Sequence, residues 1–201
     1  DFYDLIPMTD WCTEIGFQVI QLLPLNDTGY DPSPYNALSS LALHPIYLAL
    51  PKLPYFNEMA QTEEKLIPFE KYRDSQRVAY DDILRMKIDF LRDYFAEQRD
   101  RYLANEDFKS FEKHHPWVKR YALFKILKEE QNLASWTKWP DELKDPSPDQ
   151  LANLFASHRL EIEFHTFIQF SCYQQLLSVK EHAKRRGISI MGDIPILISP
   201  E

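Results

Sequence analysis

The segment Ser33-Pro34-Tyr35-Asn36 places a hydroxyl, a rigid turn, an aromatic ring and an amide at consecutive positions. This combination suits a sugar, because one face of a sugar ring stacks on an aromatic ring while its hydroxyl groups need donors and acceptors. An ordinary proline turn that packs Tyr35 against the core explains the same residues. We therefore take Ser33 and Tyr35 as candidate substrate-binding residues, with a purely structural turn as the alternative.

Asp193 is the second candidate, because it follows the apolar residues Ile190 and Met191 and precedes Ile194. This context predicts a partly buried carboxylate near the end of a strand. Such a carboxylate can support an active site, or it can cap a loop or pair with an arginine. The pattern fits both roles equally well, and neither role by itself identifies a reaction.

Other kinds of site lack their usual signals. Cys12 and Cys172 lie far apart in helical patterns, which predicts neither a disulfide framework nor a metal site. The six histidines show no ligand spacing beyond one adjacent pair. Ser33 has no Gly-x-Ser-x-Gly context, and no glycine-rich phosphate loop occurs. Trp136-x-x-Trp139-Pro140 can form a sugar platform, but we interpret it as an anchor in the core.

Two apolar runs predict the strands that position these candidates. Phe17 to Leu23 lies between Gly16 and Pro24 and is too short for an ordinary helix, and Ile188 to Asp193 is similar. We expect both to be buried strands. Polar residues after a strand suit a binding site, because α/β folds hold ligands at the carboxyl ends of their strands. Four prolines stiffen the loop 24–45, which predicts a pre-formed site.

Helical patterns fill most of the remaining chain, which contains no glycine between Tyr30 and Arg186. Apolar residues recur there at spacings of three and four. The order of helix, strand, several helices, helix and strand predicts a parallel α/β fold. The expected helices cover Asp4 to Glu14, Tyr80 to Arg99, Asn105 to His114, Pro116 to Gln131, Ser147 to Ala156 and Leu160 to Arg186, and a short extended piece is expected at Ile46 to Leu50.

The composition limits the function classes. The chain has 201 residues, 44% of them apolar, and its net charge of −8 repels nucleic acids and anionic membrane surfaces. No apolar run is long enough to cross a bilayer, and the N-terminus lacks a secretory pattern. We expect a globular, cytoplasmic protein with no nucleic acid and no membrane as partner. Asp1 and Glu201 lead us to expect that both ends are cut from a longer chain.

The chain resembles the 4-alpha-glucanotransferase family, also called amylomaltase or disproportionating enzyme, of glycoside hydrolase family 77. The resemblance spans essentially the whole chain, and Asn26-Asp27-Thr28 with His44-Pro45 is similar to the branch that includes the plant cytosolic enzymes. The segments that carry it, in the family's order, are Gln21-Leu22-Leu23-Pro24-Leu25, Ser33-Pro34-Tyr35 with Ser39, Trp136-x-x-Trp139-Pro140, Ile168-Gln169 with Gln174-Gln175, and Gly192-Asp193-Ile194-Pro195-Ile196.

This resemblance implies the N-terminal part of a (β/α)8 TIM barrel with a large helical insertion. Residues 1–55 would hold barrel helix 1, strand two and the substrate loop, residues 56–159 the helical insert, and residues 160–201 barrel helix 2 and strand three. Tyr35 would stack on the donor sugar, Ser33 would shape its loop, and Asp193 would support the active-site floor. The family's nucleophile and acid/base would lie beyond Glu201. The chain alone is therefore expected to be inactive, with the remainder of its catalytic domain as its partner.

The implied reaction is retaining transfer of α-1,4-glucan segments between maltooligosaccharides. One carboxylate forms a glycosyl-enzyme, and a second acts as acid and then as base. No cofactor is implied, because carboxylates supply the needed protons and charge. The alternatives are an α-glucan hydrolase of the same group, which differs in the acceptor, and a non-catalytic helical interaction module.

Overall fold

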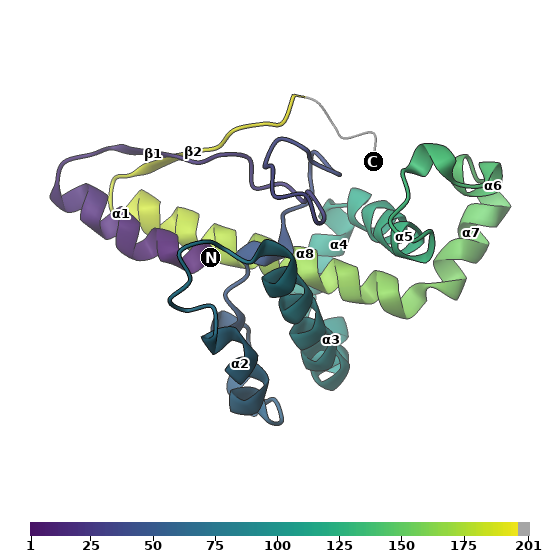
Figure 1. The fold of residues 1–201 in the computed structure, drawn as a ribbon, viewed down its shortest axis with the longest axis horizontal. Coiled ribbons are helices and arrows are strands. Elements are labelled where there is room, and N and C mark those ends of the chain that lie inside the picture. The colour runs from purple at the N-terminus through teal and green to yellow at the C-terminus, as the bar shows by residue number, and fades with distance from the viewer. Residues whose placement is uncertain (197–201) are drawn as a thin grey trace.

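The computed structural model describes residues 1–196, which form a mostly helical fold with one small sheet (Figure 1). The helices are α1 (Leu5–Glu14), α2 (Thr62–Glu70), α3 (Tyr80–Ala104), α4 (Glu106–His114), α5 (Trp117–Glu130), α6 (Asp141–Lys144), α7 (Pro148–Ser157) and α8 (Arg159–Arg185). The strands are β1 (Val19–Gln21) and β2 (Ser189–Met191). Short 3-10 helices are η1 (Phe2–Asp4), η2 (Pro45–Tyr47), η3 (Leu50–Lys52), η4 (Phe56–Glu58) and η5 (Trp136–Lys138).

Helix α8 organises the molecule, because α1, α3, α4, α5 and α7 all contact it, as does β2. The two strands lie along one side of α1 and α8, and α2 and α3 project from the opposite side (Figure 1). Aromatic rings fill the core between α3, α4 and α8. The ring of Phe167 stacks on Phe95 at a centroid distance of 4.9 Å and meets Tyr102 edge-on at 4.7 Å.

Strands β1 and β2 pair in parallel, with Ile20 opposite Ile190 in the register. The predicted strands at Phe17 to Leu23 and Ile188 to Asp193 are therefore present and adjacent, but only three residues of each are strand. The prediction that they are buried is wrong, because Phe17, Val19 and Leu23 are 58%, 52% and 60% exposed. The apolar cluster beneath them contains Cys12, Ile20, Ala183 and Ile188, so α1 and α8 cover one face of the sheet only.

Each strand follows a helix that ends at a glycine with a positive φ angle. Gly16 after α1 has φ of +86°, and Gly187 after α8 has φ of +74°. Glycine adopts this left-handed conformation without a steric penalty, which lets the chain turn back along the helix it has just left. Both turns therefore send a strand in the same direction, as a parallel pair requires.

The predicted helices are confirmed, and α3 continues five residues further, to Ala104. The capping box at the start of α7 is present, with reciprocal hydrogen bonds between Ser147 and Gln150. Helices α2 and α6 were not predicted. The extended piece expected at Ile46 to Leu50 is wrong, because η2 covers Pro45–Tyr47 and η3 begins at Leu50. The imidazole of His44 accepts the Ile46 backbone N–H and so caps the first of these turns.

Candidate functional site

The structure joins two of the candidate residues directly. The Tyr35 hydroxyl donates a hydrogen bond of 2.9 Å to Oδ2 of Asp193, whose Oδ1 accepts the Ile194 backbone N–H at 2.8 Å. Tyr35 is 47% exposed and lies outside the core. The Asp193 carboxylate raises the pKa of the Tyr35 phenol, which therefore stays neutral and keeps its proton for this bond. One residue comes from the loop after β1 and the other from the carboxyl end of β2, so the bond lies where the two strands end.

Asp31 shapes the turn that carries Tyr35. Its Oδ1 accepts the Ser33 backbone N–H at 2.8 Å, and its Oδ2 accepts the Asn36 side-chain amide at 2.7 Å. The Asn36 bond and then the Ser33 bond lower the pKa of the Asp31 carboxyl, so it is ionised and holds both donors. Ser33 thus contributes its backbone to the turn, two residues before Tyr35.

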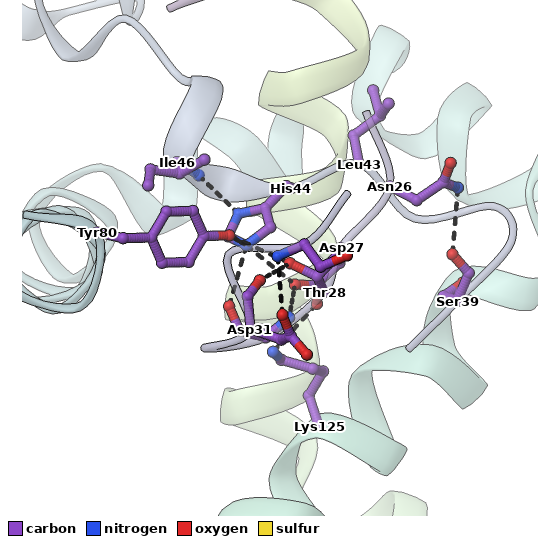
Figure 2. A network of polar contacts seen from close by, with 12 residues as sticks. Asn26, Asp27, Thr28, Asp31, Ser39, Leu43, His44, Ile46, Tyr80 and Lys125 are labelled. Carbon is purple, nitrogen blue, oxygen red and sulfur yellow. Dashed lines mark hydrogen bonds and ion pairs between the residues drawn. The ribbon is translucent and has the colours of Figure 1, made fainter. Parts of the chain in front are cut away.

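A buried carboxylate, Asp27, lies at the centre of a polar network at the base of the same loop (Figure 2). Its Oδ1 accepts the Gly29 N–H at 2.9 Å, and its Oδ2 accepts the Tyr121 hydroxyl at 2.5 Å. Lys125 Nζ lies 3.0 Å from Oδ2. Burial alone raises the pKa of a carboxyl, but the charge of Lys125, the Tyr121 hydroxyl and the Gly29 N–H together lower the Asp27 pKa well below its ordinary value. Asp27 is therefore a buried anion with its partners in place.

His44 joins this network as a neutral imidazole. Its Nδ1 accepts the Ile46 N–H at 3.1 Å, which assigns the proton to Nε2, and Nε2 lies 3.0 Å from the Gly29 carbonyl oxygen to which it donates. Burial lowers the pKa of His44. The Tyr80 hydroxyl from α3 also contacts Nε2, and the Thr28 hydroxyl lies 3.2 Å from the Tyr80 hydroxyl. The loop is thus tied to α3 as well as to α5.

Two glutamine side chains on α8 hold the backbone between β1 and η3, and each amide makes two hydrogen bonds to one backbone residue. The Gln169 side chain donates to the Leu43 carbonyl and accepts the Leu43 N–H, each at 2.8 Å. Gln175 makes the same pair of bonds to Ala49, at 2.8 and 3.0 Å. The amide completes the hydrogen bonds of backbone that lies outside helix and sheet, and so fixes the loop against α8.

A cavity of about 430 Å³ lies between this loop and α5. Hydroxyl, amide, carboxylate, ammonium and aromatic groups surround it, which suits a small polar ligand with an apolar face. Lys125 belongs both to the cavity wall and to the Asp27 network. The lining residues are Thr28, Gly29, Tyr30, Asp31, Asn36, Leu38, Lys125, Lys128, Glu129 and Leu133.

Other site types find no support in the described part of the chain. Residues 1–196 contain no group of three or more His, Cys, Asp or Glu side chains that could hold a metal ion. Over the same residues, no helix combines the length and the apolar character that spanning a membrane requires. Cys12 and Cys172 are both buried and unpaired with each other.

The tryptophan pair divides between two environments. Trp139 is buried, its ring stacks on Phe124 at 5.5 Å, and its indole N–H donates to the Ala134 carbonyl at 3.0 Å. It is a core anchor, as interpreted from the sequence. Trp136 is 44% exposed and does not share that role.

Sequence reasoning missed the Asp27 network altogether. From the sequence, Asp27 is only part of a family motif, and Tyr121 lies among the apolar positions of the helical pattern at Pro116 to Gln131. One signal was available, because an acidic residue two positions before Gly29, which has φ of +64°, is typical of a side chain that accepts a backbone N–H in a tight turn. The partners on α3 and α5 left no such signal.

A sequence profile of the family described as 4-alpha-glucanotransferase matches residues 1–201. The 4-alpha-glucanotransferase of Chlamydia muridarum is 38% identical over 100% of this chain and 38% of its own length. The rice enzyme of that name, from Oryza sativa subsp. japonica, is 30% identical over 98% of the chain and 22% of its own length. The chain thus spans about 38% of the length of the first curated relatives it matches.

Two solved structures share the fold. The amylomaltase from Streptococcus agalactiae in complex with acarbose has a TM-score of 0.76 at 24% identity, over 98% of this chain and 40% of that chain. The amylomaltase from Corynebacterium glutamicum has a TM-score of 0.75 at 20% identity, over 98% of this chain and 28% of that chain. At these identities the likeness concerns the fold alone.

Proposed function

The chain belongs to the 4-alpha-glucanotransferase family, and on that premise we propose that the full-length protein transfers α-1,4-glucan segments between maltooligosaccharides. This chain contributes the N-terminal part of a (β/α)8 barrel, in which β1 and β2 are neighbouring strands and the helices between them form an insertion. Tyr35, Ser33 and Asp193 belong to the sugar site, and the reacting carboxylates come from the remainder of the protein.

The observation that carries the proposal is the hydrogen bond between Tyr35 and Asp193. It holds an exposed aromatic ring beside a carboxylate at the carboxyl ends of two parallel strands, which is where barrels bind substrates. An exposed tyrosine ring offers an apolar face on which a sugar can stack. The acarbose complex of a streptococcal amylomaltase supports an oligosaccharide as the ligand of this fold.

The chemistry follows from the polar groups. Retaining transfer needs one carboxylate as nucleophile and another as acid and base, with a sugar 4-hydroxyl in place of water as acceptor. The groups in this chain do not react. Tyr35 stacks on the donor sugar next to the bond that breaks. Asp193 orients the Tyr35 ring by accepting the hydrogen bond from its hydroxyl.

Tyr35→Ala in the full-length protein tests the proposal. We expect transfer from maltotriose to fall by about ten- to a thousandfold, or roughly 1.4 kcal/mol of transition-state stabilisation for each tenfold. The melting temperature changes little, because the side chain is half exposed. Tyr173→Ala is the matched control, since Tyr173 is 40% exposed on α8 and its ring contacts Phe111 and His115 at the end of α4.

Product analysis separates the competing functions. Longer maltodextrins together with glucose demonstrate transfer, whereas glucose and maltose alone demonstrate hydrolysis. A full-length protein that produces neither, and binds no acarbose, contradicts both. A Tyr35→Ala variant that melts early but transfers normally per folded molecule shows that Tyr35 is structural.

A further inference from the structure

The loop that carries Tyr35 has little secondary structure to hold it. Between β1 and η2, the described backbone makes one isolated antiparallel bridge, at Asn26 and Leu43. The position of the Tyr35 ring therefore depends on what anchors the rest of this loop. Backbone that lies outside helices and sheets is held in place by individual hydrogen bonds, so the residues that anchor it can be identified one by one.

Asp27 anchors three separate parts of the loop. Its backbone N–H donates to the Ala42 carbonyl at 2.9 Å, and its carbonyl accepts the Leu38 N–H at 2.7 Å. Its side chain accepts the Gly29 N–H. Asp27 thus holds both ends of the segment 29–38, through Gly29 and Leu38, and Tyr35 lies within this segment. Whatever fixes Asp27 thus fixes both ends of the segment that presents Tyr35.

Helix α5 is what fixes the Asp27 side chain. Tyr121 and Lys125 are one helical turn apart, and both point at Oδ2 of Asp27 (Figure 2 shows Lys125). The Asp27 side chain is 0% exposed and that of Lys125 is 17% exposed. A carboxylate buried to this degree is costly without its counter-charge, so the position of Asp27 follows the position of α5.

We propose that Lys125 and Tyr121 are positioning residues for the glucan transfer, acting through Asp27 to hold the Tyr35 segment against Asp193. The inference rests on the proposed function for its kinetic consequence, but the mechanical coupling stands apart from it. It gives the helices between the two strands a part in substrate binding, although they supply no group that touches the Tyr35–Asp193 bond.

The first test measures the coupling without using activity. In the full-length protein, Lys125→Met and Tyr121→Phe are compared with the wild type by amide hydrogen exchange. We expect faster exchange in residues 29–38 and unchanged exchange in α8. Lys119→Met is the matched control, because Lys119 lies on the same helix, is 52% exposed and, within residues 1–196, forms its ion pair with Glu112 at 3.4 Å rather than with Asp27. Unchanged exchange of residues 29–38 in both variants overturns the proposal.

The second test is a double-mutant cycle on transfer from maltotriose. Lys125→Met alone is expected to lower kcat/KM by about ten- to a hundredfold, because small misplacements of a binding group are costly. In a Tyr35→Ala background the same change should have no further effect, since the group it positions is gone. Losses that multiply, or a Lys125→Met variant with wild-type kcat/KM, overturn the proposal. A wild-type protein that does not transfer at all instead refutes the proposed function, and the exchange test still decides the coupling.

Discussion

The aromatic core between α3, α4 and α8 and the Asp27 carboxylate at the centre of the polar network are equally inaccessible to solvent, but they are stabilised by different forces. Phe108 and Phe167 are 0% exposed, and so is Asp27. Burying the rings lowers the free energy of the folded state, and this requires no particular partner. Burying the carboxylate raises the free energy of the folded state. Only Lys125, Tyr121 and a backbone N–H placed around it offset this cost.

This difference assigns separate tasks to the two regions. An apolar core tolerates small shifts, because its contacts are numerous and individually weak. A buried ion with three specific donors has one satisfactory geometry. The core therefore determines whether the helices stay folded, and the Asp27 network determines where a loop on their surface comes to rest.

The largest effect is expected for Phe167→Ala, in the middle of the aromatic core. Removing the ring abolishes its stacking on Phe95 and Tyr94 and leaves a cavity. The free energy of unfolding should fall by about 3–5 kcal/mol. Chemical denaturation of the full-length protein measures this loss. Transfer per folded molecule should stay unchanged, and a drop in it would show that the core also positions the site.

A smaller effect is expected for Asp27→Asn, which keeps the shape of the side chain and removes its charge. The loss should be about 1.5–3 kcal/mol, as for hydrogen bonds to charged groups. Because the folded-state pKa lies below the ordinary value of 3.8, this contribution is complete above that value and is lost as the pH falls towards the lowered pKa. Denaturation at about pH 7 and about pH 3 should therefore show a gap between wild type and variant that narrows in acid. A gap that is constant over this range contradicts the assignment of a buried anion.

The smallest effect is expected for a pair of changes on α8, Gln169→Ala and Gln175→Ala. Each leaves one residue of loop backbone without its two bonds, at a cost of about 1–2 kcal/mol in the free energy of unfolding. Gln169 holds Leu43, which adjoins the Asp27 network at His44, whereas Gln175 holds Ala49 further along. Steady-state kinetics should show a raised KM for maltotriose only in Gln169→Ala. Equal KM values in the two variants would contradict the inference that Gln169, and not Gln175, helps to position the loop that carries Tyr35.

The sequence was informative where a pattern repeats. Phe95 and Phe164 belong to apolar stripes with helical spacing, which predict their helices, and both residues are buried. Tyr35 and Asp193 were found because each follows a predicted strand. Val19 is β-branched and apolar like a buried strand residue, yet it is 52% exposed. Its exposure depends on which elements cover the sheet, and a three-residue strand does not encode that.

The Asp27 network could not be found in this way. Its partner Tyr121 is 94 positions away in the chain, on a helix face that reads as apolar core. A single charge has no period, and the identity of its partner depends on the packing angle of helices that the sequence does not state. Polar anchors of a loop are thus the part of a binding site that a single sequence reveals least.

The parallel pairing of β1 and β2 also determines the order in which the molecule can assemble. Val19 faces Ser189 across the sheet, and the Tyr35–Asp193 bond spans 158 residues. Contacts of such long range form late in folding, because the chain must be brought together before they repay the lost entropy. Helices α3 to α8 can meet earlier through shorter-range contacts. We therefore expect the two halves of the proposed sugar site to come together only after the helices between them have packed, so that those helices act as the template for the site.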